Sequence, residues 1–328
     1  MQFDSHILKR CWFLAGPTAC GKSAAGCELA ELLSAEIIAL DSMSLYRGMD
    51  VGTAKPDAAS QARVPHHLID VLEPHQEYSL AEYVDAAERV ASQIVARGRV
   101  PLFVGGTGLY LRGVLRGVFE GPAADWGLRH ELAALAKSEG NAALHSRLSR
   151  IDPQLAARLP AADLRRVIRG IEVFELTGIP LSVLQRQEPR PADECRHVFW
   201  LHPPRAWLYE RINSRVEAMF NAGLVAELQR LLSREQPPGK TARQALGYKE
   251  VIDHLEGGVS LPETISMIQT RTRQFAKRQH TWFKNLVECT AVEIAGTETP
   301  REIALRLTNS PIGGSPGPDN VDDVDSLR

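Results

Sequence analysis

Short apolar runs alternate with longer segments of helical periodicity over the first hundred residues of the chain. The apolar runs have the length of buried strands, and they are Cys11–Ala15, Glu36–Leu40, His67–Val71 and Val100–Val104. Between them, Lys22–Leu33 and the segment from Ser79 to Ala96 gather their apolar side chains on one helical face. Apolar strands separated by helices predict an α/β fold with a parallel sheet covered on both faces.

The pattern changes after residue 112, where helical periodicity continues without a strand-like run. The expected helices are Gly127–Lys137, Ala142–Ser149 and Ala162–Leu176, followed by helices over most of Trp207–Leu286. Strand character returns at Arg196–Leu201. We therefore predict a helical insertion domain at 113–195 between two parts of one α/β core, 10–112 and 196–309. The last segment, 310–328, is rich in Gly, Pro, Ser and Asp, which predicts disorder.

The composition of the 328 residues, 44% apolar and 24% charged, is that of a globular protein. No apolar run has the length of a membrane span, and no secretory signal pattern begins the chain. We therefore expect a cytoplasmic protein that does not bind membranes, and we expect a monomer. Five scattered cysteines without a C-x-x-C pair indicate neither a zinc site nor a disulfide framework.

A phosphate-binding motif follows the first expected strand. The sequence GPTACGKS matches G-x-x-x-x-G-K-[ST] and stands between an expected strand and an expected helix. Backbone N–H groups of such a loop surround phosphate oxygens, the lysine adds positive charge, and the hydroxyl can ligate Mg²⁺. The predicted phosphate-binding residues are Gly16, Pro17, Thr18, Ala19, Cys20, Gly21, Lys22 and Ser23, with Ser23 as the Mg²⁺ ligand.

A carboxylate follows the second expected strand, whereas the fourth ends in Gly105-Gly106-Thr107 without one. Nucleotide hydrolases usually carry an acid that holds Mg²⁺ after such a strand. Asp41 follows Glu36–Leu40 instead. Because the carboxyl ends of parallel strands form the ligand crevice of a sheet, we expect Asp41 and Thr107 to lie near the phosphate loop. This arrangement suits a reaction that needs a carboxylate base beside a bound di- or triphosphate.

Positive charge is concentrated in two segments although the formal net charge is −2. The segment Thr264–Leu286 contains no Asp or Glu. Its basic residues are Arg271, Arg273, Lys277, Arg278 and Lys284. A second group, near Arg158 in the insertion, consists of Arg165, Arg166 and Arg169. Two basic groups in a chain with a phosphate loop indicate contacts with nucleic-acid phosphates.

Four motifs resemble those of the tRNA dimethylallyltransferases, also called tRNA isopentenyltransferases, of the IPP transferase family. They are GPTACGKS, DSMSLYRGMDVGTAKP (41–56), GGTGLYL (105–111) and TRQFAKRQHTW (272–282). Their order and spacing are those of the family, and the resemblance extends from Trp12 to Leu286. Ser44 is a departure, because a longer polar residue such as Gln is expected at that position.

The resemblance implies a P-loop core like that of nucleotide kinases and a prenyl transfer from dimethylallyl diphosphate. The acceptor would be the adenosine 3′ of the anticodon, in the anticodon stem-loop of tRNAs that read codons beginning with U. It also implies three catalytic residues. Asp41 would accept the proton of the adenine amine, Arg215 would hold the departing pyrophosphate, and Thr107 would contact the nucleotide or the leaving oxygen. Arg211 and Arg215 are one helical turn apart, so both can face one ligand.

The resemblance further assigns tRNA contacts to four segments and two single residues. They are Asp41, Ser42, Met43 and Ser44; Arg165, Arg166, Val167, Ile168 and Arg169; Gln244, Ala245, Leu246, Gly247, Tyr248 and Lys249; Lys277, Arg278, Gln279, His280, Thr281, Trp282, Phe283 and Lys284; and Thr107 and Arg129.

Three other functions remain open at this point. A nucleotide or small-molecule kinase would use the same loop to bind ATP, with Arg165, Arg166 and Arg169 in a lid. A prenyltransferase acting on free adenine nucleotides would share the donor chemistry, although the basic helix favours tRNA. A non-enzymatic RNA-binding module would not need Lys22 and Asp41 together.

Overall fold

The computed structural model describes residues 2–119, 121–185 and 188–310. They form two compact units, which we call the P-loop unit (3–115 and 189–310) and the helical unit (described residues between 116 and 188). The boundaries expected for the insertion lie a few residues outside the helical unit. Leu115 belongs to the P-loop unit, where its side chain is buried and its carbonyl accepts a hydrogen bond from Arg190 Nε at 3.1 Å.

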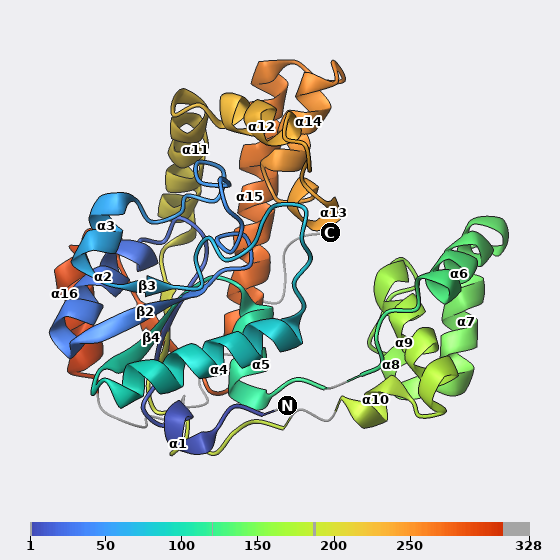
Figure 1. Ribbon diagram of the computed structural model, residues 1–328, viewed down its shortest axis with the longest axis horizontal. Coiled ribbons are helices and arrows are strands. Elements are labelled where there is room, and N and C mark those ends of the chain that lie inside the picture. The colour runs from blue at the N-terminus through green and yellow to red at the C-terminus, as the bar shows by residue number, and fades with distance from the viewer. Residues whose placement is uncertain (1, 120, 186–187, 311–328) are drawn as a thin grey trace. The chain divides into compact units, whose positions relative to one another are not determined.

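One parallel sheet forms the centre of the P-loop unit (Figure 1). Its strands are β1 (Trp12–Ala15), β2 (Ala35–Leu40), β3 (His66–His67), β4 (Val100–Gly105), β5 (Val198–His202) and β6 (Thr290–Glu293). They lie in the order β3-β2-β4-β1-β5-β6, and every pair is parallel. The predicted parallel α/β fold is confirmed, and β1 lies between β4 and β5.

Apolar side chains project from both faces of the sheet. Leu14 and Leu102 share a core with α2 (Lys22–Leu33) and with α16 (Pro300–Thr308). Their neighbours Phe13 and Phe103 point to the opposite face, where the two rings stack with centroids 4.8 Å apart. The helix α4 (Leu80–Ala96) contacts β2 and β4. It begins with the predicted capping box of Ser79 and Glu82.

The remaining helices of the P-loop unit follow the strands or precede them. They are α1 (Ser5–Leu8), α3 (Ala58–Arg63), α5 (Gly108–Arg116, which runs to the unit boundary), α11 (Arg205–Asn221), α12 (Leu224–Leu232), α13 (Lys240–Arg243), α14 (Tyr248–Leu255) and α15 (Leu261–Lys284). α15 packs against both α11 and α14. Together α11 to α15 confirm the helices expected over 207–286.

The third strand was predicted wrongly. The sequence indicates a strand over His67–Val71, but β3 comprises only His66–His67. Leu68 and Asp70 have φ angles of 57° and 55°, so the backbone leaves the extended conformation directly after β3. The elements that were not predicted include the last strand and the last helix of the described chain, β6 and α16. Three of the four residues of β6 are exposed, so its sequence lacks the apolar run of a buried strand.

The helical unit contains α6 (Trp126–Glu139), α7 (Asn141–Ile151), α8 (Pro153–Ala156), α9 (Leu164–Thr177) and α10 (Leu181–Leu184). Its own core includes Leu132, Leu144, Leu148, Val167 and Ile171. The described residues of this unit form no strand, as expected from the sequence. The disorder predicted for 310–328 concerns residues that, after Ser310, lie outside the described ranges. Nowhere in the described part of the chain is a helix both long and apolar enough to cross a membrane.

Candidate active site and nucleic-acid interface

The phosphate loop connects the end of β1 to the start of α2. Ala19 and Gly21 have φ angles of 65° and 91°, so the loop turns through left-handed backbone before the helix begins at Lys22. Alternation of such conformations turns successive N–H groups toward a common point, which forms an anion-binding concavity. Of the eight predicted phosphate-binding residues, Gly16 to Gly21 connect β1 to α2, and Lys22 and Ser23 lie in the first turn of α2, as the motif requires. Burial raises the pKa of the Cys20 thiol, so this cysteine stays protonated.

Three cationic side chains contact the phosphate loop. Lys22 Nζ donates to Pro17 O at 3.2 Å, Arg211 Nε donates to Ala19 O at 3.0 Å, and an Arg215 Nη donates to Thr18 Oγ1 at 3.2 Å. Arg211 and Arg215 both lie on α11, so the helical spacing seen in the sequence does bring both to one site. Both residues are half-buried, and this partial burial lowers the pKa of Lys22 and that of Arg215.

Asp41 and Thr107 lie together at the carboxyl ends of β2 and β4, where Leu40 pairs with Gly105. The N–H of Ser42 donates to Thr107 Oγ1 at 3.1 Å, and the N–H of Met43 donates to Asp41 Oδ1 at 2.9 Å. The negative charge of Asp41 raises the pKa of Lys22 and of Arg215, against the effect of burial. The carboxylate, the two cations and the phosphate loop therefore form one electrostatic unit.

Gln279 of α15 connects the phosphate loop after β1 to the loop after β4. Its Oε1 accepts the N–H of Thr18 at 2.8 Å, and its Nε2 donates to Gly106 O at 2.8 Å. Gly106 leaves room for this contact, because a Cβ there would lie 2.3 Å from Gln279 Nε2. Gln279 was predicted to contact tRNA, but its side chain is buried and holds the phosphate loop to the residue before Thr107.

A cleft of about 590 Å³ is lined by Arg215, whose guanidinium also contacts Thr18 of the phosphate loop. One wall is the segment from Asp50 to Ala58, and Asp70 contributes beside it. The opposite wall is α11, which contributes Arg215, Ala218, Met219 and Ala222. The cleft therefore has a guanidinium beside the phosphate loop and mostly apolar groups along α11.

The residues predicted to contact tRNA divide into three groups by exposure. The exposed ones are Arg165, Arg166, Gln244, Lys249, Lys277, Arg278, Thr281 and Lys284. The half-buried ones are Asp41, Ser42, Met43, Thr107, Arg129, Arg169, Leu246, His280 and Trp282. The buried ones are Ser44, Val167, Ile168, Ala245, Gly247, Tyr248, Gln279 and Phe283. The exposed side chains are accessible to a large ligand, although Arg166 and Lys249 are paired with Asp163 and Asp253 on their own helices or helix ends.

The basic residues of α15 have different environments. Arg271 pairs with the buried Glu250, and an Arg273 Nη donates to Asn213 Oδ1 at 2.6 Å. These two side chains thus join helices of the P-loop unit. Lys277, Arg278 and Lys284 are exposed. The exposed basic residues of α15 therefore all lie in its second half.

Arg129 and Arg169 share one carboxylate in the helical unit. Glu172, whose side chain is 0% exposed, accepts hydrogen bonds from Arg129 Nε at 2.8 Å, from Arg169 and from the N–H of Asp125 at 2.9 Å. Burial alone would raise the pKa of Glu172, but the hydrogen bonds from the two guanidinium groups outweigh it and lower the pKa below 4.5. Both arginines are thereby held in fixed positions.

Replacing Glu172 by Gln is expected to lower the free energy of unfolding of the helical unit by about 1–3 kcal/mol near pH 7. A carboxylate whose pKa is lower in the folded state stabilises above its unfolded pKa, and this contribution disappears as the pH falls through the folded pKa. The difference from wild type should therefore shrink in acid. Amide hydrogen exchange in α9, measured near pH 7 and below 4.5, checks both statements.

Glu175→Gln is the matched control, because Glu175 pairs at 2.7 Å with Arg147 at the surface. Its expected cost is at most about 1 kcal/mol. Equal destabilisation by the two substitutions would contradict the role given to Glu172.

The fold and the site define a P-loop protein with a carboxylate, Asp41, at the same sheet edge as its phosphate loop. The comparisons with known proteins make this more specific. The family model of the IPP transferases matches residues 44–286, and the chain belongs to this family.

Similarity to individual members extends over most of the chain. This chain is 45% identical over 275 residues to tRNA dimethylallyltransferase 1 of Trichlorobacter lovleyi, and the alignment covers 83% of this chain and 90% of that protein. The solved tRNA isopentenylpyrophosphate transferase of Bacillus halodurans is similar over 90% of this chain and 93% of its own, at 40% identity and a TM-score of 0.66. A eukaryotic dimethylallyltransferase acting on tRNA shares the fold at 24% identity, with a TM-score of 0.72 over 93% of this chain and 81% of that chain.

Two residues with structural importance for the site were not predicted in these roles. Gln279 connects loops 261 and 173 positions away in sequence, and Glu227 binds a segment 175 to 177 positions away. Gln279 at least stands within a recognised motif. Nothing in the local sequence of Glu227 distinguishes it from an ordinary surface glutamate of an amphipathic helix.

Proposed function

We propose that this chain transfers a dimethylallyl group from dimethylallyl diphosphate to the exocyclic amine of an adenosine in tRNA. The acceptor is the adenosine 3′ of the anticodon in tRNAs that read codons beginning with U, and pyrophosphate is released. The observation that carries the proposal is the placement of Asp41 at the same sheet edge as Lys22, Arg215 and the phosphate loop. Membership in the IPP transferase family supports it. All residues invoked come from one chain, so a monomer suffices for the reaction. The cytoplasm is the location that we propose.

The donor side of the reaction uses the phosphate loop and the adjoining cleft. Breaking the carbon–oxygen bond of an allylic diphosphate leaves two negative charges or more on the departing pyrophosphate. The loop N–H groups, Lys22 and Arg215 are placed to stabilise that charge. The apolar lining of the cleft along α11 suits the five-carbon chain.

The acceptor side uses Asp41. The amine of adenine is a weak nucleophile, because its lone pair is delocalised into the ring. As the nitrogen–carbon bond forms, the amine must lose a proton, and the Asp41 carboxylate accepts it. Thr107 Oγ1 accepts the N–H of Ser42, which keeps the residue after Asp41 in place. The hydroxyl proton of Thr107 can be donated to the nucleotide or to the leaving oxygen.

Mg²⁺ is the cofactor we propose for the diphosphate. Ser23 lies in the first turn of α2 and its side chain is exposed, so its hydroxyl can serve as one ligand. Among the residues that the structure describes, no group of three or more His, Cys, Asp or Glu side chains is arranged to hold a metal. Diphosphate oxygens and water would complete the coordination of Mg²⁺, as is usual for this ion. The ion supplies further charge neutralisation on the leaving group.

The RNA would be held by exposed basic groups on each unit. Arg165 and Arg166 are exposed on α9, and Lys277, Arg278 and Lys284 are exposed on α15. An adenosine in a loop must leave its stack to reach a carboxylate, and phosphate contacts on either side hold the strand while it does so. A kinase is less well supported, because β4 ends at Gly105 and is followed by Gly106-Thr107 rather than by a carboxylate.

One assay separates the candidate functions. The protein is incubated with Mg²⁺ and labelled dimethylallyl diphosphate, with unmodified tRNA, AMP and ATP as rival acceptors. Label in the tRNA is the expected result. Label in AMP alone would indicate free-nucleotide prenylation, and phosphate transfer from ATP without prenylation would support a kinase instead.

A further inference from the structure

Glu227 is a buried carboxylate of α12 that accepts hydrogen bonds from the backbone of residues 50–52 and from Tyr248 of α14. One oxygen accepts the N–H groups of Asp50 and Val51 at 2.9 and 2.8 Å. The other accepts the N–H of Gly52 at 3.2 Å and the hydroxyl of Tyr248 at 2.6 Å. Glu227 is only 2% exposed, and a buried carboxylate persists only where such donors replace water.

Gly52 and Tyr248 fit together without space for a side chain. A Cβ at Gly52 would lie 2.4 Å from the Tyr248 ring. Tyr248 is itself buried, and burial together with Glu227 raises its pKa, so the phenol keeps the proton that it donates. The backbone at 50–52 is therefore held by three hydrogen bonds to Glu227 and by packing against the Tyr248 ring.

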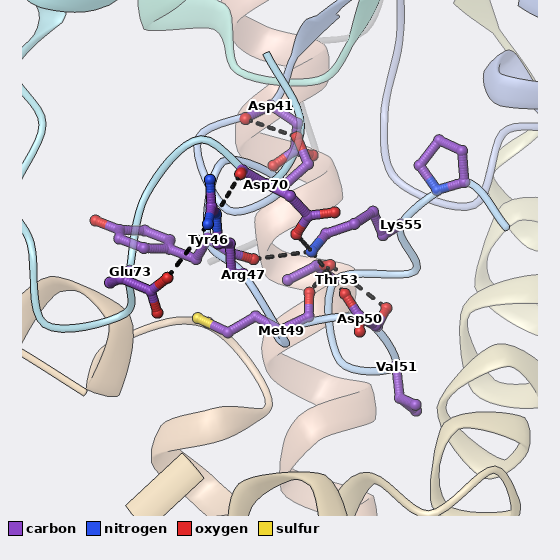
Figure 2. A network of polar contacts seen from close by, with 12 residues as sticks. Asp41, Tyr46, Arg47, Met49, Asp50, Val51, Thr53, Lys55, Asp70 and Glu73 are labelled. Atoms are coloured by element: carbon purple, nitrogen blue, oxygen red, sulfur yellow. Dashed lines mark hydrogen bonds and ion pairs between the residues drawn. The ribbon is translucent and has the colours of Figure 1, made fainter. Parts of the chain in front are cut away.

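The same segment is fixed from within by Lys55 (Figure 2). Its Nζ donates to Asp50 Oδ1 and Asp70 Oδ1, both at 2.6 Å, and to Tyr46 O at 2.8 Å. An ammonium has three N–H donors, and these three acceptors use them all. Lys55 therefore has no donor left for the diphosphate, although it is a cation on the wall of the cleft.

The backbone that Glu227 binds is also the backbone that lines the cleft. Asp50, Val51 and Lys55 form part of one wall, and Arg215 stands on the other. We propose that Glu227 is a positioning residue, oriented by Tyr248, that sets the width of the donor cleft by holding residues 50–52. Glu227 does not touch the reacting atoms. The inference rests on the proposed function in taking the cleft as the site of the prenyl diphosphate.

Glu227→Gln is the test, because it keeps the shape but presents an N–H₂ group to backbone donors. We expect the KM for dimethylallyl diphosphate to rise about 10-fold or more, with kcat and the KM for tRNA changed by less than about threefold. Amide exchange at 50–52 should accelerate, while exchange in the sheet stays as in wild type. Tyr248→Phe keeps the ring against Gly52 and removes one hydrogen bond, so its donor KM should rise only about threefold.

Glu235→Gln is the matched control, because it removes the same charge from an exposed position just beyond α12. An unchanged donor KM in Glu227→Gln, with exchange at 50–52 accelerated, would overturn the positioning role. The role would also be overturned if kcat fell and both KM values rose by similar factors in Glu227→Gln and in Tyr248→Phe alike, with amide exchange accelerated throughout the P-loop unit. Failure of the proposed function is recognised separately, because wild-type protein would then transfer no label to tRNA.

Discussion

Asp41→Asn is expected to slow prenyl transfer to tRNA by about 10²–10⁴-fold. Asparagine has the shape of aspartate and its Oδ1 can still accept the N–H of Met43, so the turn after β2 is preserved. What the variant lacks is a group that can take the proton of the adenine amine. Affinity for inorganic pyrophosphate should hold or improve, because a negative charge leaves the surroundings of Lys22 and Arg215.

Single-turnover rates with saturating donor and tRNA measure this effect, and calorimetric titration with Mg²⁺ pyrophosphate measures the affinity. Asp85→Asn is the control, because Asp85 pairs with Arg89 at the surface of α4. A wild-type single-turnover rate in Asp41→Asn would show that another group or water accepts the proton. Loss of pyrophosphate affinity would instead indicate that the substitution disturbs the phosphate loop.

Lys22→Met is expected to lower kcat/KM for dimethylallyl diphosphate by about 10²–10³-fold, as loss of one donor to a developing negative charge does elsewhere. The methionine side chain has a similar volume but no charge. Only Arg215 and the loop N–H groups would then stabilise the departing pyrophosphate. Pyrophosphate should also bind more weakly. The acceptor tRNA should bind as in wild type, because the exposed basic residues of α9 and α15 are untouched.

The pH dependence of pyrophosphate binding gives an independent check. A lysine is charged only below its pKa, and burial lowers the pKa of Lys22 from its ordinary value of 10.5. Wild-type affinity should therefore begin to fall at a pH below 10.5 as the ammonium loses its proton, and Lys22→Met should lack this step. Lys9→Met, which removes an ammonium paired with Asp193 at the surface, should keep it. Retention of the step in Lys22→Met would assign it to another group.

Local signals predicted much of the core. The capping box at Ser79, the apolar runs of β1, β2 and β4 and the phosphate loop each depend on residues within one short segment, and the structure contains them all. β3 is shorter than predicted because the backbone is left-handed at Leu68 and Asp70. An apolar run in the sequence does not reveal such a conformation. Exposed strands such as β6 carry too few apolar positions to be recognised.

Side-chain roles that depend on distant partners were harder to predict. The sequence assigned Gln279 to the RNA, yet its partners Thr18 and Gly106 become visible only when α15 packs beside the sheet. Glu227 likewise has its role only because residues 50–52 lie against α12. Val167 and Phe283 stand next to exposed basic residues on α9 and α15, but both are buried, because one face of each helix packs inward.

The strand order also bears on how the protein is made. β1 lies between β4 and β5, but β5 begins at Val198, after the whole helical unit. A ribosome therefore releases β1, β2 and β4 on the order of 10 seconds before β5, the strand that pairs with the free edge of β1. During that interval one edge of β1 is unpaired, while the helical unit, with a core of its own, can already fold. The nascent chain must then admit β5 beside a strand made nearly two hundred residues earlier, a long-range closure that slows folding and favours protection by chaperones.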